Sequence, residues 1–159
     1  MASRVFIVRG QGGLYSSVFR KNGYIGIGFF KNDTFKEKWD LSSKEFLVKE
    51  YRKLHIDLDD RRIGIYTGQA HRFVNSITIG DIVICPYSDN SLLIGQVEGG
   101  LYFSDDKSSP LTWRKRVNWL KDKVDRKIFS KPLWFALRSS QTVFEIKQTE
   151  EVISLISQV

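Results

Sequence analysis

Apolar positions follow a strand-like spacing in several short runs of the chain. The first run, 4–9, is dominated by Val, Phe and Ile and predicts a buried strand followed by a glycine-rich turn. A strand is also expected over 24–30, where two internal glycines mark either a bulge or the close approach of another backbone or a ligand. Other apolar runs bounded by turn residues predict strands at 82–85, 92–97, 101–103, 114–119 and 142–146. The polar turn that separates the first two of these predicts a hairpin.

Helix-like spacing occurs between and after these strands. A helix is expected over 42–55, because Ser42 begins a Ser-x-x-Glu capping box and apolar residues then recur on one face. Apolar residues at intervals of three and four predict a longer helix over 63–77. A short helix is expected over 131–137, and a C-terminal helix capped by Thr149.

The order of these elements predicts the fold class. Strands, helices and then mostly strands and turns indicate an α+β fold built on a small, curved, mixed β-barrel with helices packed around it. The 159 residues, of which 42% are hydrophobic, suffice for one domain spanning 1–159. Because no apolar run approaches the roughly 20 residues of a membrane span, and the N-terminal run is too short for a signal peptide, a cytoplasmic protein is expected.

The charge of the chain is distributed unevenly. There are 25 Lys and Arg against 18 Asp and Glu, and the net charge of +7 favours a polyanionic partner. The stretch 111–131 holds eight basic and two acidic residues, interleaved with Trp113, Trp119 and Phe129. Cations hold phosphates and flat rings stack on exposed bases, so this mixture favours nucleic acid. The alternative is a solvated basic face over ordinary core aromatics.

Candidate catalytic residues do not combine into a reaction centre. Cys85 lies inside an apolar strand, where a small buried thiol is the ordinary explanation, and His71 is a lone helix residue. Asp57, Asp59 and Asp60 resemble the carboxylate cluster of a nuclease, but an acidic helix start explains them more simply. We therefore expect a binding protein rather than an enzyme, with no metal and no cofactor.

Short stretches distributed over almost the whole chain resemble a known module. In order and spacing, the segments 6–13, 26–29, 69–74, 80–83, 94–102, 116–120 and 142–146 resemble the N-terminal module of some Mrr-type restriction endonucleases. That module is similar to the PUA-like superfamily, which includes the EVE and YTH domains and has a small curved β-barrel. The resemblance implies a reader of modified bases, in which an aromatic pocket receives a base turned out of the strand. In Mrr-type proteins a nuclease domain follows the module, so we expect that this chain either acts alone or is one piece of a longer protein, with a nuclease domain or subunit as a candidate partner.

The resemblance also implies which residues form the base pocket. Phe29 stands where the Mrr-type module has a tryptophan after Ile-Gly, and is the first candidate for a wall. Tyr102 and Trp113 are candidates for the opposite wall. Trp119 matches a family tryptophan, although the alternation of its strand also suits a core position. Gln69 is placed to bind the base edge, with a structural hydrogen bond as the alternative.

A second group of residues is expected to hold the nucleic-acid backbone. Arg9 and Arg72 match polar family positions beside the pocket, although Arg72 also suits a structural hydrogen bond. The complete set of expected backbone contacts is Arg9, Arg72, Arg114, Lys115, Arg116, Lys121 and Lys123. Trp39 and Trp134 match no family role and are expected to be packing residues.

These expectations define three hypotheses of function. The first is a DNA-binding module that recognises a modified, methylated base in a restriction or defence system. The second is a reader of modified RNA, because EVE and YTH relatives include RNA-binding domains. The third is a protein-interaction or small-ligand module whose basic stretch serves solubility alone.

Overall fold

The computed structural model describes residues 3–10, 13–28, 41–104, 106–138 and 142–158. Its strands are β1 (Val5–Val8), β2 (Tyr24–Ile27), β3 (Ile82–Pro86), β4 (Leu92–Val97), β5 (Tyr102–Phe103), β6 (Trp113–Val124) and β7 (Val143–Ile146). Its helices are α1 (Ser16–Asn22), α2 (Lys44–Leu54), α3 (Asp60–Asn75), α4 (Lys131–Ala136) and α5 (Thr149–Ile156), with a 3-10 turn η2 (Arg126–Ile128) before α4. The α+β class expected from the sequence is confirmed.

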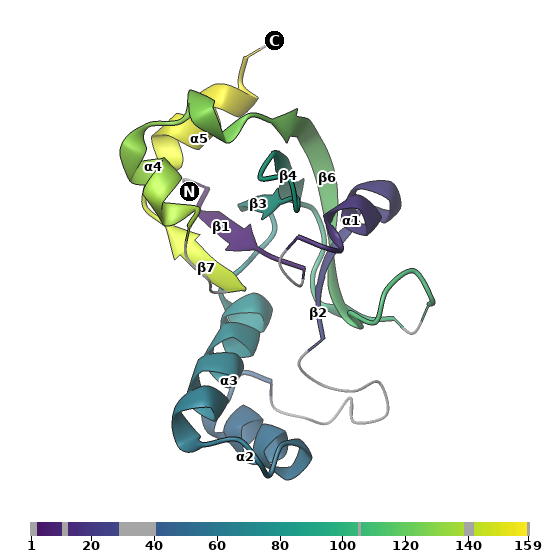
Figure 1. The fold of residues 1–159 in the computed structure, drawn as a ribbon. Coiled ribbons are helices and arrows are strands. Elements are labelled where there is room, and N and C mark those ends of the chain that lie inside the picture. The colour runs from purple at the N-terminus through teal and green to yellow at the C-terminus, as the bar shows by residue number, and fades with distance from the viewer. Residues whose placement is uncertain (1–2, 11–12, 29–40, 105, 139–141, 159) are drawn as a thin grey trace.

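The strands form one mixed sheet that curls into a half-barrel (Figure 1). Along the sheet the order is β2-β6-β4-β3-β1-β7, and β5 pairs with β6. β1 runs parallel to β3, whereas the other pairs are antiparallel. The predicted hairpin is the antiparallel pair β3–β4.

Both faces of the central strands are covered, which explains why their sequences are continuously apolar. In β1, Val5 and Ile7 pack in one core with α4 and α5, whereas Phe6 and Val8 pack in the other core with α1, α2 and α3. All four residues are completely buried. The sheet therefore separates two hydrophobic cores, with α4 and α5 on one side and a projecting α2–α3 hairpin at the other end (Figure 1).

The helix caps differ from the sequence prediction by one residue in two cases. The α2 cap is Ser43 rather than Ser42, and its hydroxyl accepts a hydrogen bond from the Phe46 N–H at 3.1 Å. α5 begins at Thr149, so this threonine is the first helical residue and not the cap. For α3 the acidic start is confirmed, because the Asp59 side chain accepts from the Arg62 N–H at 2.8 Å.

Two elements depart further from the prediction. α1 was not expected, since it has seven residues and no side-chain cap, and it ends at Gly23 in the left-handed conformation. β6 is twelve residues long, extending from Trp113 to Val124 rather than ending at 119. Gly26 in β2 and Gly28 just after it have a packing reason: a Cβ would lie 3.1 Å from the Leu111 side chain at Gly26 and 3.0 Å from it at Gly28.

No helix among the described residues combines the length and the apolar character needed to span a bilayer.

Candidate functional site

The predicted basic stretch divides between the interior and the surface. Arg114 and Lys115 stand side by side in β6, and their exposed fractions are 0% and 3%. From Arg116 onward the strand alternates towards solvent. The expectation that Arg114 and Lys115 contact a nucleic-acid backbone is therefore wrong, because protein atoms surround both side chains.

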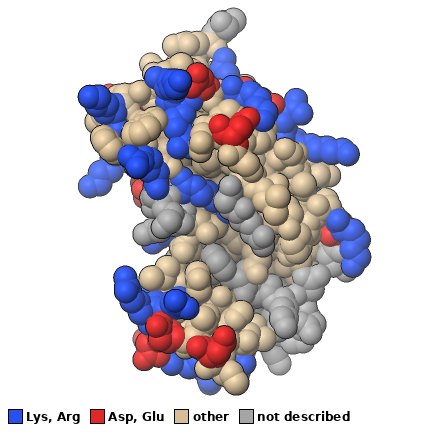
Figure 2. Space-filling view, in the orientation of Figure 1, with Lys and Arg blue, Asp and Glu red and all other residues tan. Residues whose placement is uncertain are grey.

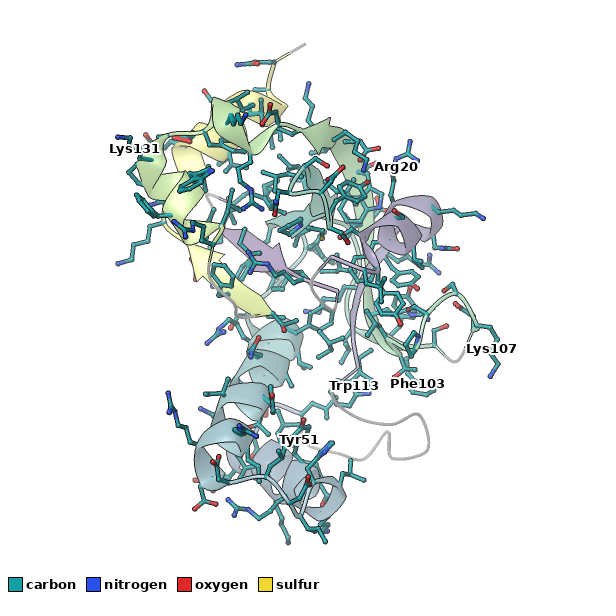
Figure 3. The ribbon with its side chains drawn as sticks, in the orientation of Figure 1. Arg20, Tyr51, Phe103, Lys107, Trp113 and Lys131 are labelled. Atoms are coloured by element: carbon teal, nitrogen blue, oxygen red, sulfur yellow. The ribbon has the colours of Figure 1, made fainter. Side chains whose placement is uncertain are left out.

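Arg114 organises the loop between β5 and β6. Its guanidinium donates to the carbonyl oxygens of Leu111 at 2.7 Å and Ser109 at 3.2 Å, and to the Asp106 carboxylate. It also lies 4.1 Å from the centre of the Tyr24 ring. Hydrogen bonds from Ser108 and Arg114 hold the pKa of Asp106 well below its usual range. Lys107, at the tip of this loop, projects into solvent (Figure 3).

Lys115 fastens the end of α3 to the sheet. Its ammonium donates to the carbonyl oxygens of Val74, at 3.1 Å, and Ile77. Burial lowers its pKa to about 8, and the carboxylate of Asp81 opposes this shift. The cation neutralises the negative end of the helix dipole, which is a structural role.

Two residues of the predicted base pocket, Trp113 and Gln69, have structural roles instead. Trp113 belongs to the larger core and is 1% exposed, so it forms no wall of an open pocket. Gln69 is buried, and its side-chain oxygen accepts the N–H groups of Thr142 and Val143, the latter at 3.0 Å. These positions correct the pocket assignment of Trp113 and Gln69, and for Gln69 they match the structural alternative.

Trp119 is half-buried against the same core, as its strand alternation suggested. Its indole N–H donates to the carbonyl oxygen of Phe19 at 2.8 Å. The ring edge comes so close to Gly95 that a Cβ there would lie 2.5 Å from Trp119 Cε3. Trp119 thus joins α1, β4 and β6.

Tyr102 stays partly accessible, as Trp119 does. It is half-buried in β5, and the Arg116 guanidinium lies 5.2 Å from its ring centre. Burial raises the pKa of the Tyr102 hydroxyl, while Arg116 and Arg114 act in the opposite direction. Phe29, the other predicted wall, lies outside the described residues.

The remaining predicted cations have protein partners at the surface. Half-buried Arg72 donates to the carbonyl oxygen of Val143, and Lys121 donates to that of Gln158 at 3.0 Å. Lys123 lies 3.4 Å from the Asp89 carboxylate and 3.7 Å from the Tyr87 ring centre. To bind a phosphate, each of these side chains would have to give up a contact with the protein.

Arg9 reaches from the end of β1 towards α4. Its guanidinium donates to the carbonyl oxygen of Leu137 and lies 5.8 Å from the Phe144 ring centre. Burial lowers the pKa of Arg9, and the nearby charge of Arg126 lowers it further. Two cations are thus held close together beside α4.

The surface around α4 combines exposed rings with cations. Leu133 and Leu137 fasten α4 to the smaller core, which turns Phe135 outward to an exposed fraction of 58%. The guanidinium of Arg138 lies 5.1 Å from the Trp134 ring centre and 5.9 Å from that of Phe135. We call this the α4 surface, and define it as Arg126, Lys127, Lys131, Trp134, Phe135, Arg138 and Lys147.

The cations of the α4 surface have no acidic partner within 4 Å among the residues that the structure describes. Elsewhere several cations are paired, as in Arg20 with Asp122 at 2.5 Å. Figure 2 shows blue side chains gathered over α4, and Figure 3 shows Lys131 at its outer edge. An anionic ligand would complete this surface electrostatically.

Two hollows lie on either side of α4. One, of about 630 Å³, is bordered by Phe135, Arg138, Phe144, Glu145 and Lys147. The other, of about 530 Å³, is bordered by Trp134 and several charged residues of both signs. These residues are Asp89, Lys123, Asp125, Arg126 and Lys127.

Sequence reasoning missed most of the α4 surface. It treated Trp134 as a packing residue, but neither core includes that ring. The available signal was the spacing of Leu133 and Leu137, which share a buried helix face and leave Trp134 and Phe135 on another. Trp39 lies outside the described residues.

The chain belongs to a family described as a domain of unknown function, DUF8426, whose model matches residues 9–147. No curated protein matches it. Among solved structures, it is similar to the crystal structure of protein Atu2648 from Agrobacterium tumefaciens, with a TM-score of 0.40 and 9% identity. That alignment covers 97% of this chain and 91% of the other, and the TM-score is too low to define the fold.

Proposed function

We propose that this chain is a non-enzymatic DNA-binding module that recognises a modified base turned out of the duplex, as the specificity part of a restriction or defence system. The observation that carries the proposal is the α4 surface, where five cations without acidic partners in the described structure surround two accessible rings. The partner is DNA, and a nuclease domain or subunit would supply cleavage.

The cations support binding to a polyanion. Lys127, Lys131 and Arg138 are exposed, and each can displace a counterion from a phosphate. Such contacts hold the duplex in place without reading its sequence. They account for affinity, and base recognition must come from another part of the module.

The PUA-like fold that we propose supports recognition of an everted base. The curled mixed half-barrel agrees with it at the level of overall architecture. Among the predicted pocket residues, Tyr102 retains access to solvent and lies beside the exposed cation of Arg116. A ring at this position would restore part of the stacking that a base loses on leaving the duplex, which is worth a few kcal/mol.

The proposal is tested by titrating labelled duplexes that differ only in one base. The duplexes carry adenine, N6-methyladenine, cytosine, 5-methylcytosine or 5-hydroxymethylcytosine, at about 150 mM salt. We expect one modified duplex to bind more tightly than its unmodified counterpart. Equal affinities across the panel would refute base recognition, and no salt-dependent binding at all would refute DNA binding.

Paired variants test the interface. Replacing Lys131 and Arg138 by Ala should weaken binding to every duplex, and should reduce the slope of log affinity against log salt by about 0.9 per lost contact. The matched control replaces Arg61 and Arg62 by Ala, two exposed cations in the first turn of α3, away from α4 (Figure 1). Equal losses in both double variants would point to a general effect of net charge.

RNA is the second candidate partner, and the accessible rings of Trp134 and Phe135 favour it. Sequence-specific RNA recognition uses aromatic side chains to stack unpaired bases. Competition between DNA and RNA strands of the same sequence decides between the two, and preferential binding of the RNA would replace the DNA assignment.

A further inference from the structure

Two aromatic side chains of α4 form a ridge that belongs to neither hydrophobic core. Trp134 and Phe135 are adjacent, with ring centres 5.4 Å apart and planes at 75°. The buried residues of α4 are Leu133 and, just past its end, Leu137, whereas the rings contribute to neither core. Phe135 is exposed and Trp134 is half-buried, so both rings remain accessible, and adjacent accessible rings of this kind mark an interaction site.

The ridge separates the two hollows, and each hollow joins one ring to cations. Phe135 borders the larger one with Arg138, Lys147 and one carboxylate, that of Glu145. Trp134 borders the smaller one with three cations, Lys123, Arg126 and Lys127, and two carboxylates, those of Asp89 and Asp125. Both volumes, about 630 and about 530 Å³, are large enough for a small planar ligand. In both hollows the cations outnumber the carboxylates, so an occupant with flat faces for the rings and negative charge for the excess cations fits best.

Two partly buried arginines, Arg9 and Arg126, lie close together beside the ridge. Burial lowers the pKa of both Arg9 and Arg126, and the two guanidinium groups repel each other. The Nε of Arg126 is buried, and no hydrogen-bond acceptor for it exists in the described part of the chain. A bound phosphate would relieve the repulsion, and could accept a hydrogen bond from an arginine that reorients towards it.

We propose that the α4 ridge seats an unpaired stretch of DNA, with successive bases stacked on Trp134 and Phe135 and their phosphates held by the cations of the α4 surface. The inference rests on the proposed DNA-binding function and specifies which form of DNA this surface takes. In a duplex the base faces cover one another, so a ring can stack only where the bases are unpaired. Eversion of a read base itself leaves an unpaired partner on the other strand, which such a ridge can receive.

The experiment compares a single strand with a duplex of the same length. Fluorescence anisotropy measures the affinity of the full chain for labelled oligo-dT and for the oligo-dT·oligo-dA duplex at equal salt. We expect tighter binding of the single strand. Trp134→Leu and Phe135→Leu should each weaken that binding roughly five- to a hundredfold, the range found for loss of one stacking ring. Neither should change the salt slope, because no charge is removed.

Conservative and distant variants serve as controls. Phe135→Tyr keeps a ring and should retain single-strand affinity, while Ile56→Ala trims an 88% exposed apolar residue after α2 and should have no effect. Thermal unfolding of each variant verifies that the fold persists.

The outcomes separate this inference from the proposed function. The ridge proposal is overturned if both leucine variants keep the single-strand affinity of the wild type. It is also overturned if they lose affinity for the duplex by the same factor as for the single strand. Tighter binding of oligo-U than of oligo-dT assigns the ridge to RNA and overturns it as a DNA site. If modified duplexes are still distinguished in those cases, the proposed function stands; if no DNA binds, both fail.

Discussion

The ammonium group of Lys115 donates a hydrogen bond to the carbonyl oxygen of Val74 over 3.1 Å, and so connects β6 to the last turn of α3. Carbonyl oxygens at this end of a helix have no partner within the helix. The sequence places Lys115 in a basic stretch expected to bind phosphate, but in the structure this lysine caps the end of α3 in the protein interior. The same physical property, positive charge, serves the fold at Lys115 and is available to a ligand at Lys131.

This difference predicts unequal effects of the same substitution on DNA binding. Lys115→Met removes a buried ammonium group and should leave affinity and salt slope for duplex DNA unchanged. Lys131→Met removes an exposed ammonium group on the α4 surface and should weaken binding and lower the slope by about 0.9. Anisotropy titrations at several salt concentrations measure both quantities. A loss of slope in Lys115→Met would mean that this lysine does reach phosphate.

Burial of Lys115 also predicts a pH dependence of stability. Its pKa is about 8 in the folded protein and 10.5 for an ordinary lysine. Between these values the unfolded chain retains a proton that the folded chain has released, so the free energy of unfolding rises with pH. The difference in unfolding free energy between wild type and Lys115→Met should therefore increase above pH 8, by at most about 1.4 kcal/mol per pH unit.

When the unfolding free energy of Lys115→Met is subtracted from that of the wild type at each pH, the contributions of the titratable groups that both proteins share cancel. Cys85 is the main one, because burial raises the pKa of its thiol and stability then falls as the pH rises past the usual thiol range. Urea unfolding of both proteins, at several pH values below and above the Lys115 pKa of about 8, gives this difference in unfolding free energy. Parallel curves for the two proteins would show that Lys115 titrates normally.

Packing at Gly95 gives a third prediction. A Cβ at this position would lie 2.5 Å from Trp119 Cε3 and 2.6 Å from Val117 Cγ1, closer than atoms approach without displacement. Gly95→Ala should therefore lower the free energy of unfolding by about 1–3 kcal/mol, the usual cost of overpacking. Gly100→Ala is the control, since nothing in the described part of the chain, apart from its two chain neighbours, lies within 4 Å of a Cβ there. Equal urea midpoints for the two variants would contradict the close contact.

Much of the fold follows from periodicity in the sequence. α3 could be predicted because its apolar residues recur over sixteen residues, and the β3–β4 pair because a polar turn separates two apolar runs. α1 could not, because seven residues without a capping side chain give little periodic signal and tertiary packing of Phe19 stabilises the helix. Its sequence mark is Gly23, which follows basic residues as a C-terminal cap.

The candidate site was harder to predict because burial of a charged side chain depends on distant partners. Arg114 is buried because carbonyl oxygens of its own loop accept its hydrogen bonds, and Lys115 because the end of α3 lies against β6. Neither arrangement can be read from the spacing of basic residues. Phe135 and Arg138 were missed for a different reason. A helix of six residues has too few positions for its sequence to show which face is exposed.

Base recognition and backbone binding should respond to different substitutions if they reside in different parts of the module. Tyr102→Ala removes the half-buried ring beneath Arg116, and Phe29→Ala removes the wall expected from the sequence. Each should abolish the preference for a modified duplex, which for one buried methyl group is about fourfold. Salt-dependent binding should persist in both, because the α4 surface is intact.

The converse variant completes the test. The Lys131→Ala, Arg138→Ala double variant should bind modified and unmodified duplexes more weakly by the same factor, since phosphate contacts do not distinguish bases. Full discrimination in both Tyr102→Ala and Phe29→Ala would place the base pocket elsewhere. Loss of discrimination in the α4 double variant alone would instead place the base at the α4 surface itself.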